Sequence, residues 1–197
     1  MPIAVDHQSR KMFVAETTAR QIAEVGLEAT SLRTVARAAG FSTSIITHYF
    51  DSKAALLSFT YESVAAKRGA RLDRIMAKST DPLADATVAL LPIGPDGRED
   101  WLVYCAYLAS GIARSEMAGV QAKWIQRTEQ LFEEMITEEF GPTRDGVSAR
   151  DTALRLVSMV TGLSVMNVVD PDRHSEADLR RIARREVEIL RGAHAVA

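Results

Sequence analysis

Residues 32–53, LRTVARAAGFSTSIITHYFDSK, determine the fold of the N-terminal part of this chain. The stretch divides into two short helical segments, and the first segment ends at Gly40. Ala36 supplies a small side chain where two steeply crossed helices approach each other, and Gly40 suits a turn that favours positive φ. The positions that should face the core are apolar, namely Val35, Ala39, Phe41 and Ile46. Together these features predict a helix-turn-helix, whereas an ordinary helical hairpin explains only the alanine and the glycine.

The exposed face of the second short helix carries small polar side chains. They are Thr43, Ser44, Thr47 and His48. Such a face fits the major groove of DNA, where side-chain hydrogen-bonding groups reach the edges of the bases. For His48 two interpretations stay open, a contact with DNA or a solvent-exposed residue without a role.

Apolar residues recur with a helical period along almost the whole chain, and no convincing strand alternation appears. Ser31 and Ser42 are the expected N-caps of the two short helices. The second short helix is expected at residues 43–49. Further helices are expected at residues 9–25, 51–78, from 81, 99–113, 117–140, 148–169 and 175–190, with a loop at 92–97. We therefore expect an all-α protein. A three-helix helix-turn-helix domain would occupy residues 1–53, and a helical ligand-binding and dimerisation domain residues 54–197.

Composition and charge indicate an intracellular partner of negative charge. Of the 197 residues 47% are hydrophobic and 25% are charged, which is typical of a globular protein. The single cysteine, Cys105, excludes an intrachain disulfide and favours a reducing cytoplasm. No signal peptide is expected, and the most apolar run, residues 156–169, is too short to span a bilayer. Residues 1–78 hold 11 Lys and Arg against 7 Asp and Glu, and the remainder holds 13 against 19, so a polyanion would meet the N-terminal part.

The sequence lacks the motifs that an enzyme or a metal protein would need. It has no glycine-rich phosphate loop, no zinc-ligand spacing and no nucleophile motif, and its four histidines are scattered. We therefore expect no catalytic residue, no metal and no cofactor. Four arginines of the last helix are expected to form a solvated face beside a dimer interface, namely Arg180, Arg181, Arg184 and Arg185.

Residues 34–44, TVARAAGFSTS, and 48–57, HYFDSKAALL, closely resemble the DNA-binding domain of TetR-family regulators. Residues from about 101 to 190 look similar to the C-terminal domain of betaine-regulon repressors. The resemblance implies a homodimer that binds double-stranded DNA at a pseudo-palindromic operator, usually as a repressor. It implies that Arg33 contacts a phosphate or a base and that Tyr49 and Lys53 contact phosphates. Residues 43, 44, 47 and 48 would lie on the recognition helix. Ile45 departs from the polar residue found there in some members; it would either pack inward or touch a thymine methyl group, and it is not counted among the DNA-contacting residues.

The dimer is expected to form from the last two helices. Residues 148–169 are apolar nearly all round, so one face needs a partner outside its own subunit. The last helix offers an apolar seam formed by Leu179, Ile182, Val187 and Leu190. Four such helices from two subunits would make a bundle. The alternative is that both helices are buried within one subunit.

A small-molecule pocket is expected among aromatic residues of the C-terminal part. Trp101, Tyr104 and Cys105 share one helix face at the spacing i, i+3, i+4, and Trp124 lies on the next long helix. Met166 and Asn167 would pack behind them. Such a site would take an apolar or cationic metabolite that acts as an inducer, although the same residues also suit a plain core.

Three classes of function remain after these observations. The favoured one is a sequence-specific DNA-binding transcriptional regulator, a repressor that a small molecule releases from its operator. The second is a small-molecule-binding helical protein without a DNA role, and the least favoured is an all-helical enzyme.

Overall fold

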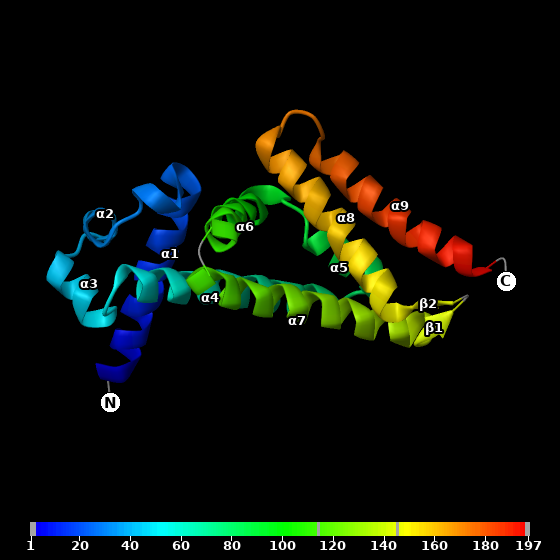
Figure 1. Ribbon diagram of the computed structural model, residues 1–197, viewed down its shortest axis with the longest axis horizontal. Helices are drawn as coiled ribbons and strands as arrows, with labels where there is room; N and C mark the ends of the chain where they lie inside the picture. The colour runs from blue at the N-terminus through cyan, green and yellow to red at the C-terminus, as the bar shows by residue number, and fades with distance from the viewer. Residues whose placement is uncertain (1–2, 114, 145, 196–197) are drawn as a thin grey trace. The chain divides into compact units, whose positions relative to one another are not determined.

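The computed structural model describes residues 3–113, 115–144 and 146–195, which form nine helices and one small hairpin (Figure 1). The helices are α1 (Ile3–Ala29), α2 (Leu32–Ala39), α3 (Thr43–Tyr49), α4 (Lys53–Met76), α5 (Pro82–Ala89), α6 (Gly94–Ala113), α7 (Ser115–Phe140), α8 (Ala149–Val169) and α9 (Glu176–Ala195). The hairpin pairs β1 (Thr143–Arg144) with β2 (Val147–Ser148) in antiparallel register. The expected all-α fold is confirmed. The hairpin was not expected, because strands of two residues are too short to show an alternating pattern.

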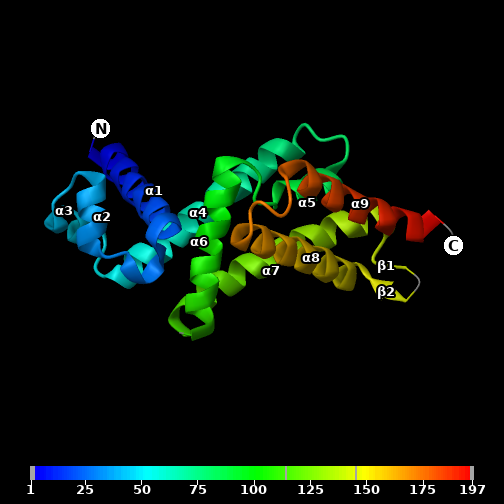
Figure 2. The ribbon, with the colours of Figure 1, turned by 90° about the horizontal axis from the view of Figure 1, so that it is seen from above.

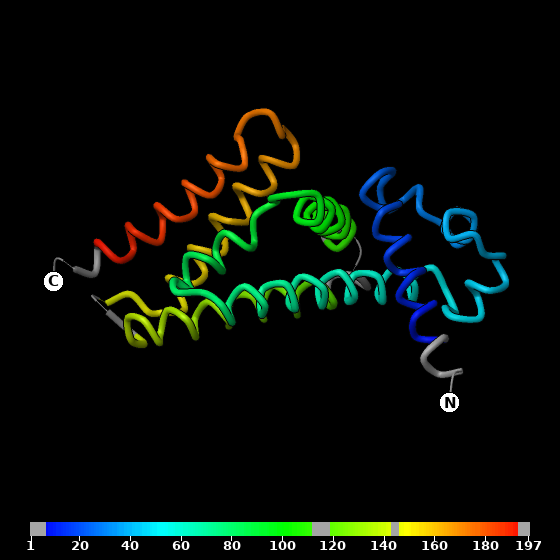
Figure 3. The backbone as a smooth tube through the Cα atoms, turned by 180° about the vertical axis from the view of Figure 1, so that it is seen from behind, coloured from blue at the N-terminus to red at the C-terminus, as the bar shows by residue number. Residues whose placement is uncertain are grey.

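The contacts of the chain divide it into two compact units. One comprises the residues up to 68 together with 102–121, and the other comprises 69–101 together with 122–197. Each unit therefore takes part of α4, α6 and α7. Figure 3 traces the backbone through these three helices. This division does not test the predicted domain boundary between residues 53 and 54, which stays a prediction.

The first unit holds α1, α2 and α3, which Figure 2 shows grouped together. Ser31 caps α2 in a capping box, because its hydroxyl accepts the Thr34 N–H at 3.1 Å and its own N–H donates to Thr34 Oγ1 at 2.9 Å. Gly40 ends α2 with a left-handed φ of 71°, and the next N–H, of Phe41, returns to the Ala36 carbonyl at 2.9 Å. The helix-turn-helix is thus built by local contacts at the predicted positions.

The core of the helix-turn-helix is small and apolar. It comprises Val14, Val35, Ala36, Ile46, Phe50 and Leu56. Phe41 is only partly buried at its edge. On α1, Ala19 and Ile22 are buried, whereas Phe13 is 43% exposed and Val14 takes the inward position. The Phe13 ring instead lies edge-on to that of Phe41 at 6.0 Å.

Two helix boundaries differ from the prediction at glycines. The first helix continues to Ala29, but Gly26 has a non-helical φ of 81° and divides it at the predicted position. The loop expected at 92–97 is shorter, because Gly94 adopts φ 69° and Pro95 then suits the first turn of α6. The Gly94 N–H donates to Glu176 Oε1 at 2.8 Å, so the start of α6 is held to the start of α9.

The second unit has its own core between α5, α8 and α9. The helix α9 buries Leu179, Ala183, Val187 and Leu190 in this core. The predicted dimer seam on the last helix was therefore wrong: Leu179, Val187 and Leu190 are buried, and Ile182 is partly buried, against the same chain. A helical pattern reveals that a face is buried, but both an intrachain core and a dimer partner produce it.

The helix α8 is long and apolar enough, at 21 residues and mean hydropathy 1.5, to cross a membrane by length and composition. The apolar run predicted from the sequence, residues 156–169, covers only part of this helix, so the predicted length of the apolar segment was too short. However, 44% of the apolar window is buried inside the chain, including Leu156, Val160 and Leu163. A core helix of a globular domain has the same composition, so this feature is weak support for a membrane span.

Candidate nucleic-acid interface

One side of α3 is exposed and the other is anchored in the core. The four predicted side chains on it are all exposed, namely Thr43, Ser44, Thr47 and His48, while Ile46 is fully buried. Ile45 is 38% exposed. It therefore does not pack inward, and an apolar side chain stands among the polar ones on the outer surface.

The hydroxyl groups of α3 are arranged by local hydrogen bonds. The hydroxyls of Ser42 and Ser44 lie 2.9 Å apart, and Thr47 Oγ1 donates to the Ser44 carbonyl at 3.1 Å. Ser42 also accepts the Ile45 N–H at 3.4 Å and so caps the helix. Because a hydroxyl oxygen can still accept while its proton is donated, these side chains remain able to bind an external donor.

Three aromatic rings cluster at the end of α3. The His7 ring lies 4.6 Å from the Tyr49 ring and 6.0 Å from the His48 ring, and the last two are 5.5 Å apart. His7 thus limits the orientations of two predicted DNA-contacting side chains. Sequence analysis missed this role, because the first helix was expected to begin at Ser9 rather than at Ile3.

Lys53 and Arg33 stand at the starts of α4 and α2. Lys53 is partly buried, and its Nζ donates to the Leu27 carbonyl at 3.2 Å. Since an ammonium has three donor hydrogens, two of them stay available. Ser52 caps α4 by accepting the Ala55 N–H at 3.1 Å, and Arg33 is exposed. The positive charge at the N-terminus of α4 is suited to a phosphate.

The six residues of the predicted ligand site fall in both units. Tyr104 and Cys105 are half-buried in the first unit, and burial raises the pKa of both. In the second unit Trp124 is half-buried, while Met166 is 53% exposed. Trp101 and Asn167 are buried there and use their polar hydrogens within the chain, donating to the carbonyls of Leu90 at 2.6 Å and His174 at 3.1 Å. The polar hydrogens of Trp101 and Asn167 therefore stabilise the fold through hydrogen bonds within the chain.

The sequence did not indicate several polar side chains that are buried in the first unit. The rings of Tyr61 and Tyr107 lie 4.7 Å apart, and Tyr107 donates to the Leu57 carbonyl at 2.7 Å. Burial raises the pKa of both phenols, and the nearby Tyr104 raises that of Tyr61 further. In the same unit Gln121 Nε2 is buried without an acceptor among the described residues. The position of Tyr107, three residues after Tyr104, places it on the same helix face, whereas no pattern in the sequence indicates Tyr61 or Gln121.

Comparisons with known proteins agree with this architecture. Residues 15–58 match the family model of bacterial regulatory proteins of the tetR family, and residues 79–192 match that of the C-terminal part of BetI-type transcriptional repressors. The HTH-type transcriptional regulator PksA of Bacillus subtilis is 28% identical over 96% of this chain and 94% of its own length. The HTH-type transcriptional regulator BetI of Burkholderia mallei is 30% identical over 83% of this chain and 84% of its own length.

Solved structures share the fold at lower identity. A putative TetR-family regulator from Rhodococcus sp. has a TM-score of 0.80 at 19% identity and covers 92% of this chain and 98% of its own. A putative transcriptional regulator from Saccharomonospora viridis in complex with choline has a TM-score of 0.82 at 20% identity, with 92% and 96% covered. From the family matches and the curated relatives, this chain belongs to the TetR family of helix-turn-helix transcriptional regulators, a non-enzymatic family, and carries a BetI-type C-terminal domain.

Proposed function

We propose that the protein is a cytoplasmic repressor that binds a pseudo-palindromic operator through α3 and is released from it by a small molecule. The exposed polar face of α3, opposite the buried Ile46, is the observation that carries the proposal. Family membership supports DNA binding. It disfavours the alternative of a small-molecule-binding protein without a DNA role.

The proposal gives the residues of this surface two kinds of role. The side chains of α3 read base edges: Thr43, Ser44, Thr47 and His48, with Ile45 against a thymine methyl group. Arg33, Tyr49 and Lys53 hold phosphates and fix the register of the protein on the duplex. His7 is a positioning residue, because its ring packs on Tyr49.

A gel shift with the DNA beside the protein's own coding region tests this function. Thr47→Ala should reduce discrimination between operator variants by about 1–3 kcal/mol if Thr47 reads a base. Lys53→Ala should weaken binding to every sequence and flatten the dependence of affinity on salt, because it removes a phosphate contact. Lys78→Ala is the matched control, since Lys78 is exposed and lies two residues beyond the C-terminal end of α4.

Two results would contradict this proposal, one for the role of Lys53 and one for DNA binding as a whole. A Lys53→Ala protein with altered sequence preference and an unchanged salt slope would reverse the assignment of Lys53. Absence of any sequence-specific binding by the unmodified protein at low salt would remove the DNA function itself.

We also propose a homodimer, with an exposed row on α8 as the interface. Leu154, Ser158, Gly162 and Met166 are all exposed and recur every four residues, the spacing that makes a ridge on a helix surface. Val169, which is 79% exposed, extends the apolar end of this row. Two copies packed through it would present two recognition helices to two half-sites about one turn of DNA apart.

The inducer site, finally, is proposed around Tyr104 rather than across all six predicted residues. Tyrosine rings can hold a quaternary ammonium by cation–π attraction, and the related structure from Saccharomonospora viridis contains choline. In the same unit, buried Gln121 Nε2 lacks an acceptor among the described residues, and a ligand that accepted from it would remove the cost of a buried unpaired donor. The ligand would favour the conformation that fits the operator poorly.

Choline titration followed by thermal unfolding tests the inducer site. Tyr104→Ala should leave operator affinity nearly intact and abolish the stabilisation by choline, whereas Tyr104→Phe should keep it if the ring face binds the cation. Trp124→Ala should also weaken the stabilisation by choline if Trp124, the other aromatic residue predicted for the site, contacts the ligand. If choline and betaine stabilise neither the unmodified protein nor any variant, the proposed ligand class is wrong.

A further inference from the structure

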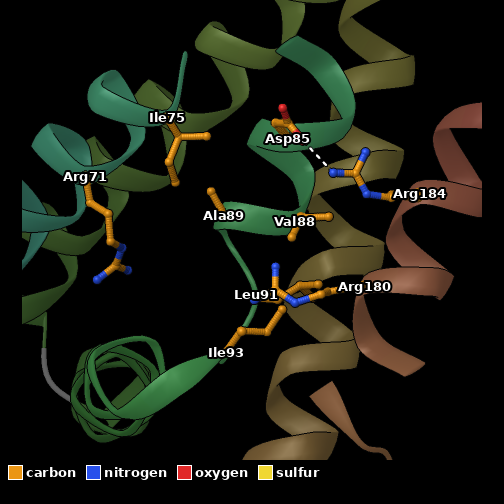
Figure 4. Close-up of a pocket in the computed structure, with 9 residues that line it drawn as sticks. All are labelled: Arg71, Ile75, Asp85, Val88, Ala89, Leu91, Ile93, Arg180 and Arg184. Carbon is orange, nitrogen blue, oxygen red and sulfur yellow. Dashed lines mark hydrogen bonds and ion pairs between the residues drawn. The ribbon is translucent and has the colours of Figure 1, made fainter. Parts of the chain in front are cut away.

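The second unit contains a groove that neither the DNA-binding surface nor the Tyr104 region explains. It has a volume of about 360 Å³ and lies between α4, α5, the residues that follow α5, and α9 (Figure 4). Its lining comprises Arg71, Ile75, Asp85, Val88, Ala89, Leu91, Ile93, Arg180 and Arg184. The volume is within the range of sites for small organic ligands.

The lining combines an apolar surface with guanidinium groups. Its five apolar residues come from α4, α5 and the connection to α6, while two of its three arginines come from α9. Figure 4 shows Arg71 on the opposite side of the groove from the α9 arginines, with Ala89 and Val88 between them. The side chain of Arg180 extends from α9 towards Leu91 and Ile93.

Two of the three arginines are neutralised by carboxylates. Arg71 pairs with Asp100 at 2.7 Å, and Arg184 pairs with Asp85 at 2.6 Å. The other oxygen of Asp85 accepts the Ser79 hydroxyl at 2.6 Å, so this carboxylate is occupied on both sides. Arg180 has no ion pair among the described residues. The groove therefore carries one uncompensated positive charge beside an apolar surface.

We propose that this groove binds a small monocarboxylate with an apolar body, held by Arg180 at its carboxylate end. A guanidinium presents parallel N–H groups that match the two oxygens of a carboxylate. The hydrocarbon part would cover Ile75, Ala89 and Ile93, which are only partly buried, and would remove their apolar surface from water. A cation would be repelled by the uncompensated charge of Arg180, and a dianion would carry more charge than this one arginine neutralises.

This site is independent of the proposed inducer site. All of its lining residues belong to the second unit, whereas Tyr61, Tyr104, Tyr107 and Gln121 belong to the first. The two sites also favour ligands of opposite charge. Binding to this groove can thus be measured without DNA, and its failure leaves the proposed function untouched.

Isothermal titration of the full chain with octanoate tests the proposal, with octanol and octyltrimethylammonium as probes of the same chain length. Octanoate should bind saturably, octanol at least about ten-fold more weakly, and the cation not measurably. Arg180→Gln should weaken octanoate binding at least ten-fold. Arg181→Gln is the matched control, because the neighbouring Arg181 is exposed and pairs with Asp178 outside the groove.

A second variant tests the apolar surface. Ala89→Phe should reduce the binding of octanoate by filling the groove, and circular dichroism would establish that the variant is folded. If Ala89→Phe does not fold, Arg180→Gln decides alone, because an exposed side chain contributes little to folding. The proposal is overturned by equal affinities for octanoate and octanol, by an unchanged affinity in Arg180→Gln, or by the absence of saturable octanoate binding.

Discussion

Lys53 serves both the fold and the proposed DNA interface. Its hydrogen bond to the Leu27 carbonyl links the start of α4 to the end of α1 and fixes where the ammonium lies. A phosphate contact would use the remaining N–H groups of the same ammonium. The loss of DNA affinity expected for Lys53→Ala must therefore be compared with the stability of the variant, because the hydrogen bond from Lys53 to the Leu27 carbonyl is lost as well.

Asp81 allows a pH-dependent test of a single ion pair. Arg191 donates to both of its carboxylate oxygens, at 2.7 and 3.1 Å, and also donates to Glu139 at 2.6 Å. The hydrogen bond from Arg191, together with the Ala84 N–H, holds the pKa of Asp81 below its ordinary value of 3.8. Because the pKa is lower in the folded state, the stabilisation is complete above about pH 4 and is lost as the pH falls through the folded-state pKa.

We expect Asp81→Asn to lower the free energy of unfolding by about 1 kcal/mol at pH 7, since the pair is one third exposed. Asparagine can still cap α5, so the difference should report the charge. In urea unfolding at a series of pH values, this difference in the free energy of unfolding should shrink as the pH falls below 3.8 and through the lower folded-state pKa of Asp81. Asp172→Asn is the control, as this exposed carboxylate has no ion pair in the described part of the chain. If the difference in the free energy of unfolding between Asp81→Asn and the unmodified protein does not vary with pH, the effect comes from the N-cap of α5 and not from the ion pair.

At the scale of the element, the turn between α2 and α3 depends on the backbone of Gly40. A Cβ at this position would meet no atom within 4 Å, so any cost of a larger residue comes from the φ of 71° alone. Gly40→Ala should lower the free energy of unfolding by about 1–2 kcal/mol. Gly69→Ala, also in open space but inside the helix α4, should raise it by about 0.5–1 kcal/mol. Urea unfolding of both variants checks this, and shifts of the same sign would refute the backbone argument.

The helices α8 and α9 show a limit of amphipathic patterns. Ile182, Leu179, Val187 and Leu190 form a regular stripe, and the structure packs the stripe against the same chain. The apolar residues available to a partner lie elsewhere, on the row of α8 that contains Gly162. On α8, burial of one stripe therefore leaves a second, weaker apolar row exposed.

At the scale of the whole molecule, the proposed dimer predicts the effect of a charge on this row. A Cβ at Gly162 meets no atom within 4 Å, and glutamate is a better helix former than glycine. Gly162→Glu should therefore leave the subunit folded but place like charges together at the interface. Sedimentation equilibrium should find monomers, and binding to a two-half-site operator should weaken.

Gly119→Glu makes the same change on α7, at an exposed position that is also in open space, and should leave the assembly unchanged. A Gly162→Glu protein that sediments as the unmodified protein does would refute the α8 interface.

The prediction of the fold succeeded where structure depends on near neighbours in the chain. The bounds of α3, the caps at Ser31 and Ser42 and the turn at Gly40 follow from residues at most five positions apart. The family resemblance of the same stretch identified the DNA-binding class. The exposed α3 side chains followed from the same periodicity, because the side that carries Ile46 had to be buried.

The sequence by itself therefore determined the helices, the helix-turn-helix and its outward-facing side chains. Only the tertiary structure decided that Lys53 reaches Leu27, that His7 packs on Tyr49, and that α9 buries its apolar stripe in its own subunit. It also brought Arg71 and Arg180 to one groove from helices far apart in sequence. The physical reason is that hydrophobic burial is non-directional: a periodic pattern specifies which side chains leave water, whereas the packing of distant helices specifies what they meet.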